Sequence, residues 1–321
     1  MGGLRRKGKT YILVKHYFSM GDLLCVGIPA RNEEESIEAT IRSIVKSDAW
    51  KDSSKSGREI IVCVNDSTDR TAEIVRNLQK EIPEINLIEN KEPGKNRAIN
   101  TITKNSSRKA DVIYFSDADV VVAKDSIGKV TGELRRDRKI DFAAPVPVPT
   151  SVFTATKKRR PLAAFYAEGS GIGIKHKLYR LTGMGFAARK SVLVNKPLPE
   201  HPYIGDDRYI NLEYKGRIKV LYDAKVYFRH PSLKDHMKQR VRHAVERRTL
   251  FKIRPDLKEP YYSDAKKIRS REISHFKELS LRAKLGFLPI AAAEPLEKLV
   301  ARFKRAKTWS KIQSTKARRK V

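Results

Sequence analysis

Short apolar runs alternate with segments of helical periodicity through the first half of the chain. The apolar runs have the length of buried strands and lie at residues 23–28, 59–64, 85–88 and 111–116. The segment that follows the first run from Glu34 carries apolar residues at helical spacing, at Ile37, Ile41 and Ile44. Strands that alternate with helices predict an α/β domain whose mostly parallel sheet has helices on both faces.

Polar residues follow three of these predicted strands at the point where each strand ends. They occupy residues 29–33, 65–69 and 117–119. Ligands of open parallel sheets bind beyond the carboxyl ends of the strands. We therefore expect the three polar segments to meet around one ligand crevice.

The second half of the chain is less regular. Residues 142–148 predict an edge strand, because Pro145 and Pro147 cannot donate to neighbours on both sides. The segment 154–173 joins a basic run to a glycine-rich stretch, which suggests a mobile lid over the ligand. A strand or hairpin is predicted before His230, and the chain after it is helical and strongly basic.

Composition restricts the compartment and the partners. Lys and Arg number 68 against 37 Asp and Glu, which gives a formal net charge of +31, and the mean hydropathy is −0.53. Such an excess attracts nucleic acid, an anionic membrane surface or a phosphorylated substrate. No signal peptide is visible, and no apolar stretch reaches the roughly 20 residues needed to span a bilayer. We expect a cytoplasmic protein, either free or peripheral on the inner face of the membrane.

The two cysteines, Cys25 and Cys63, both lie in apolar runs. Two residues cannot form a disulfide framework or a cysteine zinc site. They are expected to be small core residues in a reducing compartment.

The sequence Asp117-Ala118-Asp119 carries the sharpest chemical signal. Its two carboxylates follow a buried strand and would project into the ligand crevice. Mg²⁺ and Mn²⁺ take oxygen ligands and bridge one or two carboxylates to substrate phosphates. The pattern therefore favours a divalent-cation site, although a solvated acidic turn would have the same sequence.

Two further segments suit parts of a nucleotide. In residues 65–69, Asp66 could contact the ligand while Thr68 or Asp69 caps the next helix. Gly94-Lys95 places a glycine and a cation at a helix start, which suits a diphosphate.

These segments together resemble the ordered motifs of family-2 glycosyltransferases, which have the GT-A fold. The resemblance runs from about Leu23 to about His243. It is carried by Ile28-Pro29-Ala30-Arg31-Asn32-Glu33-Glu34, by Val64-Asn65-Asp66-Ser67-Thr68-Asp69-Arg70-Thr71, by Gly94-Lys95-Asn96-Arg97-Ala98-Ile99-Asn100 and by Asp117-Ala118-Asp119.

The resemblance implies a role for residues in each motif. The family often has a glycine between Asp66 and Ser67, and its absence here leaves both uridine and guanosine open as the nucleoside. The implied roles are Pro29, Arg31 and Glu33 in the base and ribose pocket, Asp66 on the base, Lys95 near the diphosphate, Asp117 facing the ribose or sugar, and Asp119 holding the metal.

The acceptor side would lie farther along the chain. Gly205-Asp206-Asp207 resembles the family's acidic pair, whose second acid is the general base of inverting members. A carboxylate at this place can take the proton of an acceptor hydroxyl as it attacks the donor sugar. Asp207 is the expected base and Asp206 the alternative, and acid at a helix N-terminus would give the same pattern.

Two later residues complete the expected site. His230 occupies the place of a third metal ligand in some related enzymes. Residues 239–243 resemble a Gln-x-x-Arg-Trp motif in which His243 replaces the tryptophan, so Arg242 could bind diphosphate while processive polymerisation is not expected.

The expected organisation is a basic N-terminal segment (1–21), a Rossmann-like GT-A domain (22–255) and a basic helical C-terminal extension (256–321). Apolar residues at helical spacing from 296 to 309 suit either a helix on an anionic membrane or a solvated tail.

The expected reaction is inverting, metal-dependent sugar transfer from a nucleotide-sugar donor to a sugar or lipid-linked acceptor. A nucleotidyltransferase and a nucleic-acid-binding protein are the alternatives. Nucleic acid is the less expected partner, because no recognised nucleic-acid motif accompanies the charge.

Overall fold

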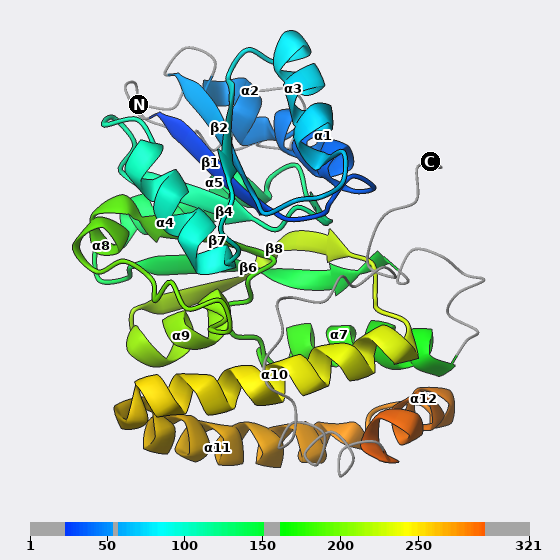
Figure 1. Cartoon of the computed structure of the whole chain (residues 1–321). Coiled ribbons are helices and arrows are strands. Elements are labelled where there is room, and N and C mark those ends of the chain that lie inside the picture. Colours follow the sequence, from blue (N-terminus) through cyan, green and yellow to red (C-terminus); the bar gives the residue numbers. More distant parts are fainter. Residues whose placement is uncertain (1–22, 54–56, 151–160, 293–321) are drawn as a thin grey trace, which may run out of the picture.

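The computed structural model describes residues 23–53, 57–150 and 161–292, and its centre is one mixed sheet (Figure 1). The eight strands lie in the order β3-β2-β1-β4-β7-β6-β8-β5. They are β1 (Leu24–Ala30), β2 (Arg58–Asn65), β3 (Ile85–Asn90), β4 (Val112–Ser116), β5 (Val120–Val122), β6 (Phe142–Pro149), β7 (Gly185–Arg189) and β8 (Ile218–Phe228).

The first four strands form the parallel half of the sheet. β1 pairs in parallel with β2 and β4, and β2 pairs in parallel with β3. β7 then runs antiparallel to β4 and β6, whereas β8 is parallel to β6 and antiparallel to β5. The predicted α/β fold with a mixed, mostly parallel sheet is confirmed.

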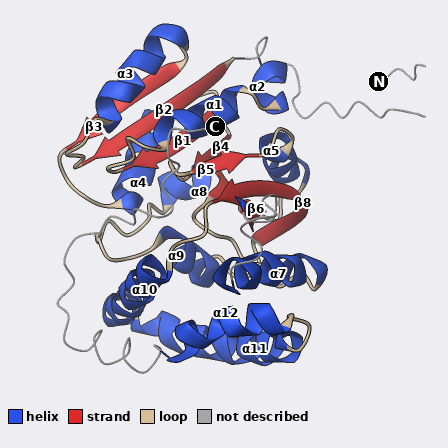
Figure 2. Ribbon diagram, turned by 90° about the vertical axis from the view of Figure 1, so that its right-hand side faces the viewer, coloured by secondary structure: helices blue, strands red, loops and turns tan. Residues whose placement is uncertain are grey.

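Helices cover both faces of this sheet (Figure 2). Alternate β1 residues face opposite cores: Val26 and Ile28 pack against α1, α3 and α5, whereas Cys25 packs against α4. The helices near the sheet are α1 (Ile37–Val45), α2 (Asp48–Asp52), α3 (Thr71–Glu81), α4 (Lys95–Asn105), α5 (Ser126–Arg136), α8 (Lys190–Asn195) and α9 (Asp206–Glu213).

The second core brings α4 very close to the sheet. A Cβ atom on Gly27 would lie 2.7 Å from Ile102 on α4 and 3.0 Å from the Phe115 ring, so only glycine fits at this place. Cys25 and Cys63 are buried in the same core and form no disulfide, as predicted. Burial raises the pKa of the Cys63 thiol to about 12, which keeps it uncharged.

The prediction that residues 142–148 form an edge strand is wrong, because β6 lies between β7 and β8. The physical reason lies in how far each pairing extends. β7 pairs only with Phe142 and Ala143, so β6 has β8 as its sole strand partner where Pro145 and Pro147 occur. The register with β8 also shifts between Pro145 and Val146, which accommodates the first missing N–H group.

The glycine-rich stretch does not form the predicted lid loop but part of helix α7 (Pro161–Lys175). Within this stretch, Gly173 makes room for the Tyr179 ring. The close approach of α12 to the start of α7 depends instead on Gly286 of α12, where a Cβ atom would collide with the Pro161 carbonyl oxygen. The basic half of the predicted lid, residues 151–160, lies outside the described residues.

A second layer of helices lies below the sheet (Figures 1 and 2). It consists of α7, α10 (Leu233–Ile253), the 3₁₀ helix η3 (Pro255–Leu257), α11 (Lys258–Phe276) and α12 (Leu281–Ala292). Within the described part of the chain, none of these helices has the length and hydropathy to cross a bilayer. The amphipathic helix predicted from residue 296 lies outside the described residues.

Candidate functional site

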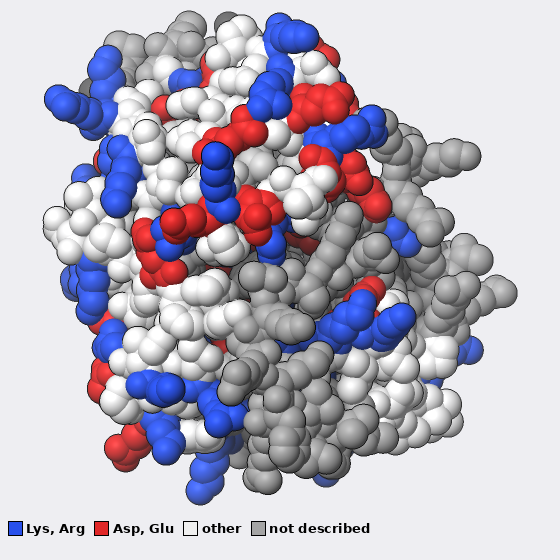
Figure 3. Space-filling model, viewed as in Figure 1, with Lys and Arg blue, Asp and Glu red and all other residues white. Residues whose placement is uncertain are grey.

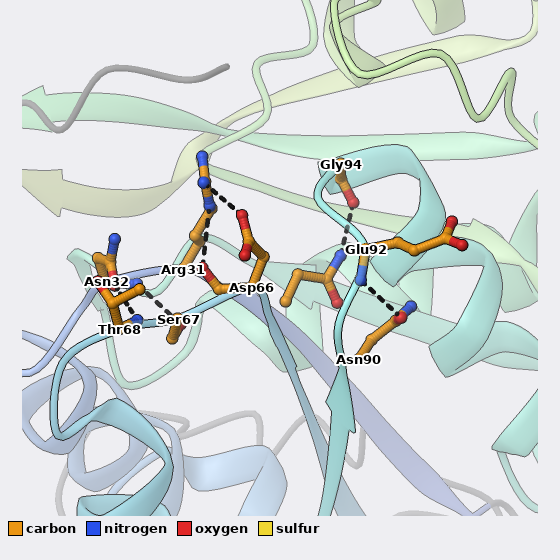
Figure 4. Close-up of polar contacts among 9 residues, drawn as sticks. Arg31, Asn32, Asp66, Ser67, Thr68, Asn90, Glu92 and Gly94 are labelled. Carbon is orange, nitrogen blue, oxygen red and sulfur yellow. Dashed lines mark hydrogen bonds and ion pairs between the residues drawn. The ribbon is translucent and has the colours of Figure 1, made fainter.

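The loops after β1 and β2 are held together by side-chain contacts (Figure 4). The Arg31 guanidinium lies 2.6 Å from a carboxylate oxygen of Asp66. Next to this pair, the Asn32 N–H donates to Ser67 Oγ at 3.0 Å, and the Thr68 N–H donates to Asn32 Oδ1 at 2.8 Å. The first two predicted motifs therefore form one structural unit.

Capping contacts fix the same loops to the helices that follow. Asp69 accepts a hydrogen bond from the Thr71 N–H at the start of α3. Of the two candidates, Asp69 rather than Thr68 therefore caps this helix. The Thr71 hydroxyl accepts from the Glu33 N–H at 2.7 Å, and the Glu33 carboxylate accepts from the Ser36 hydroxyl at 2.7 Å. Glu33 thus organises the entry to α1.

Backbone geometry explains the chain after β2. Asp66 has a left-handed φ of 46° and Asn32 one of 53°, a conformation that Asp and Asn tolerate better than most residues. Asp66 itself therefore makes the turn. The preceding residue, Asn65, donates to the Gly94 carbonyl at 2.7 Å, which ties this loop to the start of α4.

The start of α4 carries the central polar interaction of the structure. Lys95 Nζ lies 2.6 Å from Asp117 at the end of β4 and 3.0 Å from Asp206 at the start of α9. The same ammonium donates to the Gly183 carbonyl at 3.0 Å. Gly94, immediately before it, has a φ of 135°, which only glycine adopts readily. We call Lys95, Asp117 and Asp206 the lysine triad.

Burial sets the electrostatics of the lysine triad. Burial, followed by the neighbouring Asp119 and Asp206 charges, raises the pKa of Asp117 to about 7 despite the nearby ammonium. Burial likewise raises the pKa of Asp206. Burial alone would lower the pKa of Lys95, but the two carboxylates outweigh it and raise that pKa. The ammonium is therefore charged, and its two partners compete for it.

Gly183 leaves the space that the lysine triad occupies. A Cβ atom there would lie 2.5 Å from Lys95 Nζ and 2.9 Å from an Asp206 oxygen. The adjacent residue, Met184, accepts from the Asp117 N–H at 3.2 Å. Residues 183 and 184 lie in the segment 181–193, which resembles the family segment that forms the floor of the acceptor site, although neither residue was singled out in the sequence.

The two predicted acceptor-side acids have different surroundings. The Asp206 side chain is 5% exposed and belongs to the lysine triad. Asp207 is half-buried on the first turn of α9, where its Oδ1 accepts from the Arg208 N–H at 2.7 Å. Asp207 is thus the more available of the two carboxylates.

Glu246 on α10 is a further buried acid that the sequence did not single out. It accepts from the Gly205 N–H at 2.8 Å, and a Cβ atom on Gly205 would lie 2.1 Å from the same oxygen. Arg208 lies 3.7 Å from its carboxylate. Burial raises the pKa of Glu246 to about 7, with the Asp207 charge raising it and Arg208 and Arg242 lowering it.

α10 also carries Arg242 and His243, the residues of the Gln-x-x-Arg-Trp-like motif, close to Glu246. Arg242, one turn before Glu246, acts on its charge. His243, which stands where a tryptophan was expected, accepts from Arg208 through its carbonyl oxygen at 2.9 Å. Burial and the Arg242 and Arg208 charges lower the pKa of the His243 imidazole to about 3, so it is uncharged at neutral pH.

The predicted metal ligands share one end of the sheet. Asp119 directly precedes β5, whose Val120 pairs with Phe228, so His230 follows closely at the same end of the strand pair. The His230 ring stacks on Tyr166 of α7, with ring centroids 5.4 Å apart. Among the described residues, the ligand atoms of Asp117, Asp119 and His230 do not all lie within 4.8 Å of one another.

The structure therefore brings most of the predicted residues together at the carboxyl edge of the parallel strands. Pro29 differs, because it is buried within β1, opposite Cys63. On the face seen in Figure 3, acidic and basic side chains mix across the upper and middle part, and Lys and Arg predominate around α10.

Comparisons with known proteins agree with this arrangement. Residues 25–195, more than half of the chain, match the model of glycosyl transferase family 2. A mannosyltransferase from Pyrobaculum calidifontis, solved with GDP-Man and Mn²⁺, has a similar fold: the TM-score is 0.58 at 18% identity, over 92% of this chain and 81% of that one.

Residues 1–349 of S. aureus TarS, solved with UDP-GlcNAc, give a TM-score of 0.48 at 17% identity, over 70% of this chain and 66% of that one. No curated protein matches the sequence significantly. The first of these likenesses identifies the fold as the predicted GT-A type.

We predict that Lys95→Met destabilises the protein by about 3–5 kcal/mol, because removing the cation leaves two carboxylates buried without a partner. Lys104→Met on the exposed side of the same helix should change stability by no more than about 0.5 kcal/mol. Urea unfolding measures both variants. A Lys95→Met protein as stable as the control would show that the ammonium does not hold the acids.

We also predict that the change in the free energy of unfolding caused by Glu246→Gln is more favourable at about pH 8 than at about pH 5. The difference between the two pH values should be on the order of 1–3 kcal/mol. The folded pKa of about 7 lies above the ordinary 4.5. Between these values the folded state holds a proton that the unfolded state has lost, so wild-type stability falls as the pH rises through this window. Glutamine does not titrate and avoids that loss.

Melting temperatures of the two proteins at both pH values test this. The control, Glu259→Gln on the exposed surface of α11, should follow wild type at each pH. An equal effect of Glu246→Gln at both pH values would contradict the pKa shift.

Proposed function

Because the chain belongs to glycosyl transferase family 2, we propose that this glycosyltransferase moves a sugar from a nucleoside-diphosphate sugar to an acceptor hydroxyl or lipid phosphate with inversion. The observation that carries the proposal is the lysine triad. One ammonium contacts both Asp117, on the predicted donor side, and Asp206, on the predicted acceptor side. The two halves of the reaction would therefore meet at this place.

The donor would lie along the loops after β1 and β2 and against the start of α4. The Arg31–Asp66 pair borders the predicted nucleoside pocket. Free N–H groups at the start of an eleven-residue helix attract a diphosphate. Lys95 adds positive charge there, although two carboxylates already share it, so Arg242 is the proposed additional partner of the diphosphate.

A divalent cation fits this donor site by its chemistry. The lysine triad contains two carboxylates and one ammonium, and Asp119 adds another negative charge close to Asp117. Hard cations such as Mg²⁺ and Mn²⁺ need only one or two protein carboxylates besides substrate phosphates. We propose Asp119 and Asp117 as the ligands, with His230 as a third. Such a cation would neutralise charge on the departing nucleoside diphosphate.

Asp207 is the proposed general base. Its Oδ1 is engaged by the Arg208 N–H, so its other oxygen is the one to accept the proton of the acceptor hydroxyl. Glu246 and Arg208 hold the first turn of α9 in place through Gly205 and His243. As the acceptor oxygen bonds to the anomeric carbon, the bond to the diphosphate breaks and the configuration inverts.

The helical layer below the sheet also has features of a membrane-binding surface. On α12, Leu281, Leu285 and Leu288 are 75%, 50% and 58% exposed. Their spacing places them on one helix face, and Arg282 and Lys284 lie between them. An exposed apolar stripe flanked by cations matches an anionic lipid surface. We propose that α12 binds such a surface, where a lipid-linked acceptor would be available.

We predict that Asp207→Asn lowers sugar transfer by about 10²–10⁴-fold while donor binding is kept, because only proton removal is lost. Asp119→Ala should abolish the Mn²⁺-dependent part of donor binding. A thermal-shift screen of UDP-, GDP- and dTDP-sugars with and without Mn²⁺ measures binding. Release of nucleoside diphosphate measures transfer.

Asp223→Asn is the control, since this carboxylate is 70% exposed and pairs with Lys129 on α5. Full activity of Asp207→Asn would refute the base. Release of pyrophosphate from a nucleoside triphosphate would instead favour a nucleotidyltransferase, and tight, salt-sensitive nucleic-acid binding without sugar turnover would favour the remaining alternative.

For the membrane surface, we predict that the full chain co-sediments with anionic phosphatidylglycerol vesicles. Replacing Leu281, Leu285 and Leu288 by serine should weaken binding at least about tenfold, since each buried leucine contributes about 1.5–3 kcal/mol. Val194→Ser removes a similarly exposed residue on α8 and should bind as wild type. Binding that survives the triple replacement, or fails in wild type, would contradict the proposal.

A further inference from the structure

Two histidines and a glutamate meet where α7 approaches the junction of α11 and α12, in the helical layer below the sheet (Figure 2). His176 directly follows α7, His275 lies in the last turn of α11, and Glu278 lies in the turn before α12. Their ligand atoms all lie within 4.8 Å of one another. We call these three residues the His–Glu cluster.

The side chains of the His–Glu cluster converge on one atom. His176 Nε2 lies 2.7 Å and His275 Nδ1 lies 2.8 Å from the same Glu278 oxygen, Oε1. The two imidazole rings are stacked, with their centroids 3.8 Å apart and their planes 21° apart. The two imidazole nitrogens and the shared carboxylate oxygen therefore lie close together, as the donor atoms of a metal site do.

We propose that the His–Glu cluster is a binding site for a zinc-class divalent cation, with His176, His275 and Glu278 as its three protein ligands. Two imidazole nitrogens and one carboxylate oxygen form a donor set that zinc takes, with a water in the fourth position. The predicted donor-site ligands are mainly carboxylates, which suit Mg²⁺ or Mn²⁺ instead. The two sites would therefore differ in the metal that they prefer.

The distances agree with this assignment. Tetrahedral zinc with bonds of about 2.0–2.1 Å keeps its ligand atoms about 3.3 Å apart. The observed separations of 2.7 and 2.8 Å would need to open by about half an ångström to reach this value. The other Glu278 oxygen, Oε2, lies 2.9 Å from Lys175 Nζ, an outer contact that orients the carboxylate and leaves Oε1 for the metal.

The positive charges around the His–Glu cluster oppose the binding of a cation. Lys175 and Lys177 flank His176, and Lys277 precedes Glu278. Metal binding must exceed this repulsion through its bonds to the two imidazoles. For the same reason, a diffuse cation attracted by charge alone would not collect at this place.

A metal at the His–Glu cluster would connect the segment after α7 to the turn between α11 and α12. His176 belongs to the segment that leads to Gly183, whose carbonyl oxygen accepts from Lys95. His275 and Glu278 precede α12, which packs against α7 at Gly286. The cation would thus join the segment leading to the lysine triad with α12, the helix that carries the exposed leucines.

The test uses the full chain after removal of metal with a chelator, titrated with Zn²⁺ and with Co²⁺. We expect one equivalent of either metal and the intense visible absorption bands of four-coordinate Co²⁺. His275→Ala and Glu278→Gln should each weaken Zn²⁺ binding at least about 100-fold, because removing a ligand costs more than removing its outer contacts. His201→Ala, which changes a histidine outside the cluster, should bind as wild type.

Two results would overturn the proposal. One is wild-type protein that binds no Zn²⁺ and gives no four-coordinate Co²⁺ spectrum. The other is a His275→Ala or Glu278→Gln protein with unchanged Zn²⁺ affinity, which would place the metal elsewhere. Glu278 is exposed, so Glu278→Gln keeps the test valid even if His275→Ala fails to fold.

Discussion

The arrangement of this molecule depends on one buried cation between two carboxylates. Lys95 joins the start of α4, the end of β4 and the start of α9, three elements distant in sequence. Burying any one of these charges alone would be costly, so each is stable only while the others are in place. Two acids share one ammonium, and the excess negative charge raises the pKa of Asp117. The divalent cation proposed for the donor site would offset this excess of negative charge.

Three glycines make this interaction sterically possible. Gly94 adopts a positive φ that lets α4 begin with Lys95 facing the site. Gly183 and Gly205 leave room for Asp206 and Glu246, whose oxygens would collide with any Cβ atom at these positions. The two buried acids therefore stand next to residues without side chains. The packing of charged groups at this edge of the sheet therefore depends on the three glycines as well as on the charges themselves.

The mixed sheet explains why the proposed donor and acceptor groups come from different halves of the chain. The parallel strands β1, β2 and β4 present Arg31, Asp66 and Asp117 at their carboxyl ends. The antiparallel strand β7 follows Gly183 and Met184 beside β4. Below this edge, α10 supplies Glu246 and Arg242. The helical layer thus supports the proposed acceptor side of the site directly.

The sequence by itself determined the parallel half of the fold and its polar edge, because strand length, helical spacing and chain direction are local properties. It identified Arg31, Asp66, Lys95, Asp117 and Asp206, and the structure brings these residues together in two connected groups. It failed for β6, whose prolines are tolerated inside the sheet because β7 is short there. It also failed for the glycine-rich stretch, which is part of helix α7 and in which Gly173 makes room for the Tyr179 ring. Glu246 and the His–Glu cluster were decided only by tertiary structure, because contacts between helices far apart in the chain leave no local pattern.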